Sequence, residues 1–134
     1  MSKAIRYYSS KTGHTAKMAN AIGDAIGVKA ETVAVPLSEP VDQLILGASV
    51  YAYGIDNSVK EFLKANKDKI GEVYLFSQAA LIKGSYKQTS KVCKDLGIKI
   101  SRNQFWCPGE FHGVKAGRPN DKDIADAIKW AEKL

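Results

Sequence analysis

The sequence contains few cysteines and no long apolar segment, and each shortage argues against a class of protein. Only two cysteines, Cys93 and Cys107, occur in 134 residues, so we expect neither a disulfide framework nor a cysteine cluster that binds a metal. No apolar run approaches the roughly 18 residues that a membrane-spanning helix needs. The N-terminal residues enter an apolar stretch directly and do not resemble a secretory signal. We therefore expect a cytoplasmic protein without an integral membrane segment.

Several catalytic and nucleotide-binding signatures are also missing. His14 and His112 lack the spacing of metal ligands, so no metal site is predicted. The chain has no G-x-x-x-x-G-K-[ST] motif of a P-loop NTPase, and Tyr8 stands where a response-regulator receiver would need an acidic cluster. A phosphatase loop around Cys107 would need an Arg about six residues on, where Gly113 stands. With no acid–base pair visible, we predict no catalytic residue.

Acidic residues are in the minority, since 14 Asp and Glu face 20 Lys and Arg, which gives a net charge of +6. A basic protein can favour nucleic acid, anionic lipid or acidic partners. We find no clustered Arg with exposed aromatic residues, so no nucleic-acid partner is expected. The lysines recur at helical spacing, which favours solvated helix faces over a dedicated basic patch. They are Lys60, Lys64, Lys67, Lys69, Lys87, Lys91 and Lys94.

What the sequence does contain is a regular alternation of strand and helix patterns without a linker or a repeat. In the first helical segment, for example, Met18, Ala19 and Ile22 recur at a spacing of three to four residues. We expect strands at 3–8, 29–35, 43–49, 73–77 and 99–107, and helices at 15–26, 57–70, 85–96 and after Asn120. This alternation predicts a single α/β domain, residues 1–134, built on a doubly wound five-stranded parallel sheet.

The clearest local pattern spans residues 4–15, where an apolar run ends at Tyr8 and a helical pattern begins near Thr15. A helix N-terminus offers unpaired N–H groups and the positive end of the helix dipole, both of which attract anions. The turn before the helix supplies hydroxyls, and its glycine lets the backbone bend. The residues that would enclose a phosphate are Ser9, Ser10, Thr12, Gly13 and Thr15. The alternative is an ordinary strand–turn–helix junction with a Ser or Thr cap.

This turn resembles the FMN-phosphate signature of the flavodoxin family. That signature has an aromatic residue before the loop, Ser or Thr opening it, a small residue at the turn, Thr two residues on, and Ala and an aliphatic residue on the helix. The matching residues are Tyr8, Ser10, Gly13, Thr15, Ala19 and Ile22. The resemblance implies that the phosphate of FMN is held by Ser9, Ser10, Lys11, Thr12, Gly13, His14 and Thr15.

The resemblance also implies the flavodoxin-like strand order 2-1-3-4-5. In that order, a ligand binds at the carboxyl ends of the first and third strands, where the strand order reverses. Arg6 departs from the family, which prefers an aliphatic residue at this place, in a strand usually buried on both faces. How that strand is covered is therefore an open question.

Two further segments would complete a flavin site if the resemblance holds. Residues 47–54 resemble the family loop that brings an aromatic side chain beside the flavin ring, and Tyr51 or Tyr53 would stack on it, unless it packs in the core. Residues 77–80 would hold the pyrimidine edge through backbone N–H groups, while Tyr86 could face either the core or the flavin. The implied residues are Ser49, Val50, Tyr51, Ala52, Tyr53, Gly54, Ser77, Gln78, Ala79 and Ala80.

The functional expectation that follows from the resemblance is a short-chain flavodoxin, because no insertion splits the last strand. Such a protein carries electrons between redox partner proteins by means of FMN, and we expect a monomer. The first alternative is an FMN-dependent oxidoreductase of the menaquinone-dependent protoporphyrinogen oxidase type, whose loop resembles residues 47–54, or of the quinone reductase type. The second alternative is an α/β module without a flavin.

Overall fold

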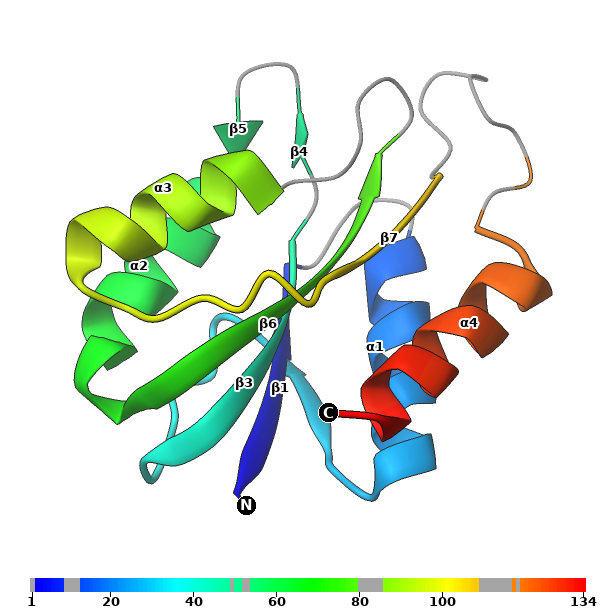
Figure 1. Cartoon of the computed structure of the whole chain (residues 1–134), viewed down its shortest axis with the longest axis horizontal. Coiled ribbons are helices and arrows are strands. Elements are labelled where there is room, and N and C mark those ends of the chain that lie inside the picture. The colour runs from blue at the N-terminus through cyan, green and yellow to red at the C-terminus, as the bar shows by residue number, and fades with distance from the viewer. Residues whose placement is uncertain are drawn as a thin grey trace.

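The computed structural model describes residues 2–8, 13–48, 50–51, 54–79, 86–108, 117 and 119–134, and it contains a five-stranded parallel sheet (Figure 1). The strands are β1 (Lys3–Tyr7), β2 (Ala30–Thr32), β3 (Val41–Gly47), β6 (Ile70–Ala79) and β7 (Phe105–Pro108). They are arranged in the order β2-β1-β3-β6-β7, and every neighbouring pair is parallel. This is the order 2-1-3-4-5, so the predicted topology is confirmed.

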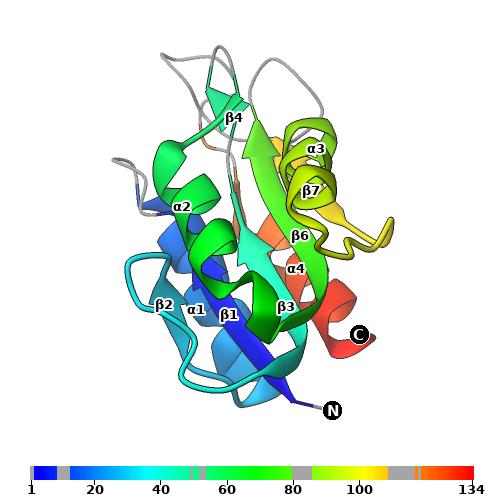
Figure 2. The ribbon, with the colours of Figure 1, turned by 90° about the vertical axis from the view of Figure 1, so that its left-hand side faces the viewer.

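Helices cover both faces of the sheet. They are α1 (His14–Ile26), α2 (Asn57–Asn66) with the short 3-10 helix η1 (Lys67–Lys69), α3 (Tyr86–Leu96) and α4 (Asp121–Glu132). Helices α1 and α4 contact each other on one face, whereas α2 and α3 lie side by side on the other face (Figures 1 and 2). Because a central parallel strand is then buried on both sides, it must be apolar over most of its length, as β3 is. Among the described residues, no helix is long and apolar enough to cross a membrane.

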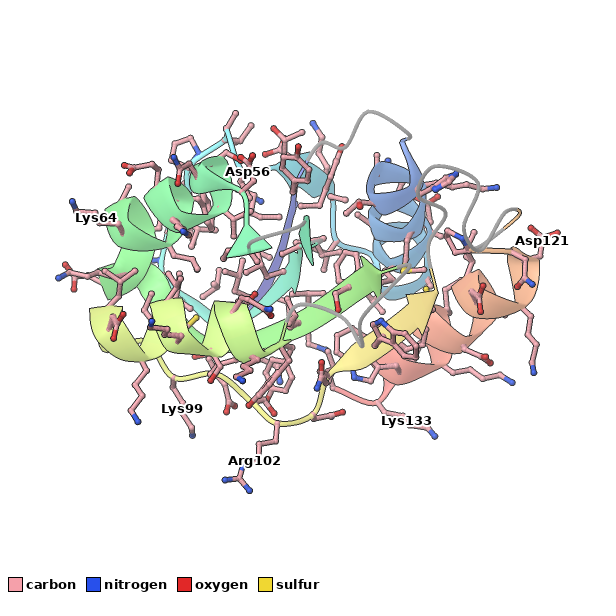
Figure 3. The ribbon with its side chains drawn as sticks, turned by 90° about the horizontal axis from the view of Figure 1, so that it is seen from above. Asp56, Lys64, Lys99, Arg102, Asp121 and Lys133 are labelled. Carbon is pink, nitrogen blue, oxygen red and sulfur yellow. The ribbon has the colours of Figure 1, made fainter. Side chains whose placement is uncertain are left out.

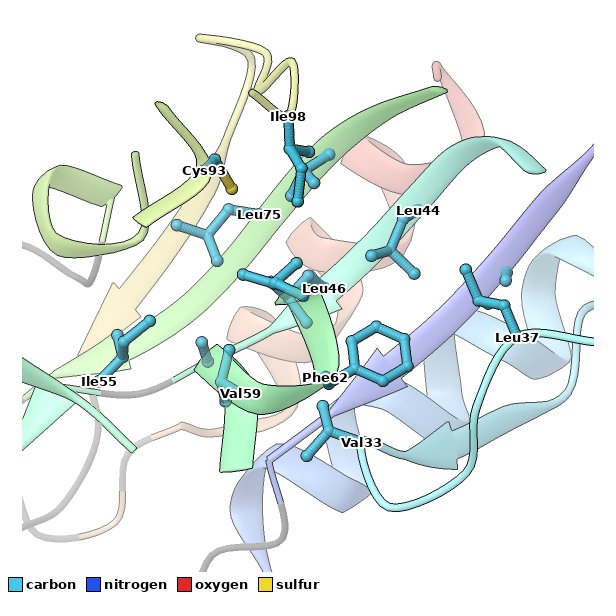
Figure 4. Close-up of a cluster of buried hydrophobic side chains, with 14 residues drawn as sticks. Val33, Leu37, Leu44, Leu46, Ile55, Val59, Phe62, Leu75, Cys93 and Ile98 are labelled. Carbon is cyan, nitrogen blue, oxygen red and sulfur yellow. The ribbon is translucent and has the colours of Figure 1, made fainter. Parts of the chain in front are cut away.

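Two clusters of apolar side chains fill the space between the sheet and the helices on its two faces. Successive side chains of a strand point to opposite faces, so Leu44 and Leu46 of β3 enter one cluster and Ile45 enters the other. The first cluster packs against α2 and α3, and Figure 4 shows Val59 and Phe62 of α2 in it. The second cluster packs against α1 and α4 and contains the residues Met18, Ala19 and Ile22 that the helical spacing singled out. The sheet is therefore fixed from both sides.

The structure shows how the strand that contains Arg6 is covered. Arg6 is buried, and its guanidinium donates hydrogen bonds to three backbone carbonyls: those of Val35 (2.8 Å), Ile5 (2.9 Å) and Pro36 (3.1 Å). The carboxylate of Glu31 lies 3.7 Å away. Burial lowers the pKa of the Arg6 guanidinium from its ordinary value, and the attraction of Glu31 partly opposes this shift. Arg6 therefore fastens the connection after β2 onto β1.

Two strand predictions were too long, and both have a local cause. The predicted strand 29–35 is reduced to Ala30–Thr32, because the chain then turns and gives its carbonyls to Arg6. The predicted strand 99–107 is reduced to Phe105–Pro108 and one isolated bridge between Ile100 and Val73. Between these, the Ser101 hydroxyl accepts a hydrogen bond from the Asn103 N–H (3.0 Å), and this local turn competes with the ladder.

Two other boundaries also differ from the prediction. The helix predicted at 57–70 ends at Asn66, whose side chain donates to the Phe62 carbonyl (2.9 Å) and accepts from the Leu37 N–H (3.0 Å). The strand predicted at 73–77 extends in both directions to Ile70–Ala79. The added residues include Gly71, Glu72 and Gln78, which apolar periodicity alone does not reveal.

Candidate functional site

The predicted site residues belong to segments at the carboxyl edge of the sheet, the upper edge in Figure 1. The structure describes the backbone of Gly13, His14, Thr15, Val50, Tyr51, Gly54, Ser77, Gln78 and Ala79. Eight other predicted residues lie outside the described part of the chain: Ser9, Ser10, Lys11, Thr12, Ser49, Ala52, Tyr53 and Ala80. The described residues form the frame of the candidate site: the N-terminus of α1, the end of β3 with the segment that follows it, and the end of β6.

The first part of the frame is the N-terminus of α1. Its N-cap residue is Gly13, in the left-handed conformation (φ 75°, ψ 3°) that favours glycine. The Gly13 carbonyl accepts the first helical hydrogen bond from Lys17 (3.0 Å), so the helix begins at His14, one residue before the predicted start. The alternative of a Ser or Thr at the N-cap position is wrong. The bend that the sequence predicted at this glycine is present.

The N-terminus of α1 differs from the other described helix starts. Helix α2 is capped by the side chain of Asp56, and α4 has a capping box formed by Asn120 and Asp123. Of the α-helices whose N-cap residue is described, only α1 has an N-cap residue that makes no side-chain hydrogen bond. Its first turn, like that of α2, has no acidic residue, whereas the first turn of α4 has Asp121 and Asp123. The positive end of the α1 dipole therefore lies at the carboxyl edge without a carboxylate from the helix itself.

Packing holds α1 in this position. Thr15, in the first turn, is 2% exposed, and Met18, Ala19 and Ile22 below it are fully buried in the second cluster. A small residue at position 19 lets the helix lie close to the sheet. The buried hydroxyl of Thr15 is therefore held at a defined place in the first turn, next to the end of β1.

The second part of the frame is the end of β3 beside β6. A side chain at Gly47 would collide with the ring of Phe76, because an added Cβ would lie 2.4 Å from its Cζ atom. The backbone is paired on both sides here, since the Tyr8 N–H donates to the Gly47 carbonyl (2.8 Å) and the Ala48 N–H donates to the Phe76 carbonyl (3.2 Å). The start of the segment 47–54 is therefore fixed by backbone hydrogen bonds and by a contact that only glycine permits.

A small hairpin follows β3, where the sequence predicted only a loop. Strands β4 (Val50–Tyr51) and β5 (Gly54–Ile55) pair antiparallel, with Val50 opposite Ile55 and Tyr51 opposite Gly54. Strand β4 contacts β6, and β5 contacts α3. Two short β-prone pairs that flank two residues are a signal from which this hairpin could have been found. The hairpin therefore lies beside β6, and its role in a flavin site stays a prediction.

The third part of the frame is the end of β6, where a predicted loop is strand. Ser77, Gln78 and Ala79 pair with Trp106, Cys107 and Pro108 of β7. The N–H and C=O groups of successive residues point to alternate sides of a strand. The Phe76 carbonyl points toward β3, because it accepts a hydrogen bond from the Ala48 N–H. The backbone groups of Gln78 therefore point to the β3 side, just beyond the last pair of that ladder, Gly47 and Phe76. Of the three residues, Gln78 is the one whose N–H could reach a ligand there.

The aromatic contacts remain partly a prediction. Tyr86 is half-buried and packs against the first apolar cluster, which corresponds to the core-facing alternative. Stacking of Tyr51 or Tyr53 on a flavin stays a prediction, because neither side chain belongs to the described part of the structure.

Both thiols are buried. Cys93 lies in the first cluster, where burial raises the pKa of its thiol to about 11. Cys107 is also buried, and it forms no disulfide. Within the described residues, no group of three His, Cys, Asp or Glu side chains could hold a metal ion.

Solved structures with this fold include several flavodoxins. A flavodoxin from the domain Archaea is 21% identical, with a TM-score of 0.70 and coverage of 98% of this chain and 97% of that chain. Flavodoxin 1 from Bacillus cereus is 17% identical, with a TM-score of 0.69 and coverage of 98% and 96%. Rubredoxin oxygen:oxidoreductase from Desulfovibrio gigas is 15% identical, with a TM-score of 0.71, and the match covers 97% of this chain but 34% of that one.

The sequence comparison is more specific than the likeness of the folds. No curated protein sequence matches the chain. A sequence profile of the flavodoxin domain family, however, matches residues 5–112. This range includes the carboxyl end of β1, the N-terminus of α1, the hairpin and the end of β6. The chain therefore belongs to the flavodoxin domain family.

Proposed function

We propose that the protein binds FMN and works as a short-chain flavodoxin that carries electrons between partner proteins. The observation that carries this proposal is the N-terminus of α1, with Gly13 as N-cap, no acidic residue in the first turn and no side-chain cap. It lies at the carboxyl end of β1, where a doubly wound sheet binds its ligands. Membership of the flavodoxin domain family supports a flavin as the ligand.

Each part of the frame has a role in this proposal. The N–H groups and hydroxyls of residues 9–15 would hold the phosphate, and Lys11 would add a positive charge. The hairpin, with Tyr51 and Tyr53, would cover one side of the ring, and the Gln78 N–H at the end of β6 would meet the pyrimidine edge. Bound FMN supplies the redox chemistry, accepting and releasing electrons one or two at a time. The protein would bind and orient the cofactor and limit the access of water.

The decisive experiment is a titration of the purified protein with FMN and with riboflavin, followed by quenching of flavin fluorescence. We expect FMN to bind at micromolar concentration or below and riboflavin to bind more weakly, because riboflavin lacks the phosphate. Equal affinity for the two would contradict the phosphate site at α1. No binding of either at micromolar concentration would contradict the proposed cofactor.

The second candidate is an FMN-dependent oxidoreductase of the protoporphyrinogen oxidase or quinone reductase type. The observation that favours it is that the same fold forms a part of rubredoxin oxygen:oxidoreductase, a larger chain named for an enzymatic reaction. Multiple turnovers by the FMN-loaded protein without a partner protein, either of a quinone with NADH as the electron donor or of protoporphyrinogen with menaquinone as the electron acceptor, would favour the enzyme. Electron transfer that needs a reductase and an acceptor protein would favour the carrier.

The remaining parts of the proposal concern the whole chain. We propose that residues 1–134 form one domain, that it acts as a monomer, and that it is cytoplasmic. Two buried cysteines that form no disulfide are compatible with a reducing compartment. Size-exclusion chromatography with light scattering checks the monomer, and a dimer would contradict it.

A further inference from the structure

Lysine side chains form two matching rows on the neighbouring helices α2 and α3. Residues three and four apart share one face of a helix. The first row is Lys60, Lys64 and Lys67, and the second is Lys87, Lys91 and Lys94, so both have the spacing i, i+4, i+7. Lys67 follows the last residue of α2 with helical dihedral angles, so the spacing holds through it. All six are exposed, and α2 contacts α3, so the two helices bring these lysines to the same side of the sheet.

The positive charge of the described chain is concentrated on this side of the sheet. Residues 57–69 and 86–102 contain nine Lys and Arg but three Asp and Glu. Residues 14–26 and 121–134, on the opposite face, contain four Lys and Arg and five Asp and Glu. In Figure 3, Lys64 and Lys99 extend from the side of α2 and α3, and Asp121 lies at the far end on α4. We call the exposed cations of residues 57–69 and 86–102 the lysine face.

The charges of the lysine face are largely uncompensated. Among the ion pairs of the described residues, one involves this face, between Lys99 and Glu72 at 3.8 Å. The Lys69 ammonium donates to the Leu37 carbonyl (3.0 Å). The acidic residues of these segments, such as Glu61 and Asp95, form no ion pair with a described residue. Because like charges at i, i+4 destabilise a helix, an anionic partner would relieve a repulsion that the folded chain carries.

We propose that the lysine face is the docking surface for an acidic protein partner. A membrane would be met by apolar side chains that insert into it, but the exposed large hydrophobic residues of the described chain, Val35 and Trp106, lie outside α2 and α3. A nucleic-acid surface would use arginine and stacking aromatic rings, whereas Arg102 is the one arginine of this face. Lysine ammonium groups are hydrated point charges that favour reversible, electrostatically steered association between proteins.

The position of the lysine face matches this partner. Helices α2 and α3 both start at the carboxyl edge of the sheet, so Lys60 and Lys87 lie at the end of the face nearest to the candidate flavin site. A protein docked there would border that site. The inference rests on the proposed function in one respect only, which is that the acidic partner is a redox protein.

The test compares charge reversals on the two sides of the sheet. The first variant is Lys64→Glu/Lys91→Glu/Lys94→Glu, and the matched control is Lys122→Glu/Lys129→Glu/Lys133→Glu, which changes the net charge equally on the opposite side. The probe is a fluorescently labelled 20-residue polyglutamate peptide, whose binding to the full chain is followed by anisotropy. We expect the first variant to bind about tenfold or more weakly and the control to stay within about twofold of the original chain.

The possible results separate the proposals. Equal losses in both variants would show that only net charge matters and would overturn the lysine face. Tighter binding of duplex DNA or of phosphatidylglycerol vesicles than of the peptide, with loss in the first variant, would overturn the protein partner. If the first variant does not fold, as judged by circular dichroism, Lys64→Gln/Lys91→Gln/Lys94→Gln takes its place with the corresponding glutamine control. The FMN titration is measured separately, so a failure of the flavin site would not imitate a failure of docking.

Discussion

Arg6 shows how a charged residue is accommodated inside a central strand. Its guanidinium donates hydrogen bonds to the backbone carbonyls of Ile5, Val35 and Pro36 at 2.8–3.1 Å, and these take the place of hydrogen bonds to water. A lysine could not reach all three, because its ammonium is a compact group, whereas the guanidinium is a planar fork of donors. The residue that departs from the family pattern is therefore structural, and it fixes the connection between β2 and β3.

We expect Arg6→Met to lower the free energy of unfolding by about 2–3 kcal/mol, because three hydrogen bonds from a charged donor are lost. Urea denaturation followed by circular dichroism measures this. The free energy of unfolding of the control Arg6→Lys should lie between that of the original chain and that of Arg6→Met. A Met variant as stable as the original chain would mean that desolvation of the guanidinium offsets these bonds.

For the phosphate site, we expect Thr15→Ala and Thr12→Ala each to weaken FMN binding by on the order of 1 kcal/mol or more, since each removes a hydrogen bond to a charged group. Fluorescence titration measures the change. Ser101→Ala is the matched control, because it removes a hydroxyl near the amino end of β6, away from the carboxyl edge. Unchanged affinity in both threonine variants would exclude the proposed phosphate contacts.

The thiol of Cys93 should be unreactive in the folded protein. Its pKa of about 11 leaves about one thiol in a thousand ionised at pH 8, and the side chain is fully buried. We expect no reaction of the native protein with Ellman's reagent within minutes and the reaction of both cysteines in guanidinium chloride. Rapid labelling of one thiol in the native protein would show that its cluster opens readily.

At the scale of elements, the N-terminus of α1 differs from those of α2 and α4 in how it is capped. Helices α2 and α4 satisfy their first N–H groups with their own carboxylates or amides, from Asp56 and from Asn120. Helix α1 begins instead with Gly13, and its first turn lies at the carboxyl edge of the sheet. The hairpin β4–β5 and the extended end of β6 complete this edge. A side-chain cap stabilises α2 and α4, whereas a side-chain cap at α1 would occupy the position proposed for the phosphate.

We expect Asp56→Ala to lower the free energy of unfolding by about 1 kcal/mol at pH 7, because α2 loses its cap. Hydrogen bonds from the Ser58 side chain and then from its backbone lower the pKa of Asp56 below its ordinary value of 3.8. The carboxylate therefore contributes its stability above that value, and the contribution is lost as the pH falls through the lowered pKa of the folded state. The difference between the two proteins should shrink below about pH 4.

The control for this pH dependence is Asp56→Asn. An amide oxygen can accept the same hydrogen bond from the Ser58 N–H but does not titrate. Its stability relative to Asp56→Ala should therefore be nearly independent of pH between 7 and 3. A constant difference between the original chain and Asp56→Ala across this range would contradict the assignment of the charge to the cap.

At the scale of the whole molecule, two properties lie on different surfaces. The carboxyl edge of the sheet has the candidate flavin site, and the α2–α3 side has most of the positive charge of the described residues. Binding a cofactor at the edge links β1, β3 and β6, which form the centre of the sheet. Its effect should therefore extend to the stability of the whole domain.

We expect FMN at 100 times its dissociation constant to raise the free energy of unfolding by about 2.7 kcal/mol, because it binds the folded state only. Thermal or urea denaturation with and without FMN measures this. Riboflavin at the same concentration should stabilise less. Stabilisation by both to the same extent would argue against a contribution from the phosphate.

The local pattern predicted the frame of the site better than its details. The start of α1 and the bend at Gly13 could be predicted because hydroxyls, a glycine and an apolar helix face follow one another in the chain. The hairpin was treated as a loop, and Ser77–Ala79 were treated as loop residues. Their strand character comes from pairing with segments about thirty residues away, which is not visible in a short window.

The sequence by itself determined the class of the fold and, through the family resemblance, the order of its strands, and it predicts where an anion would bind. These properties can be predicted because they depend on the spacing of apolar residues and on the turn residues Ser, Thr and Gly, which lie close together in the sequence. Only the tertiary structure decided how Arg6 is buried, why position 47 must be glycine beside Phe76, and that lysines of two separate helices form one surface. Each of these depends on which distant segments meet, because packing and backbone pairing act between residues that are far apart in the chain.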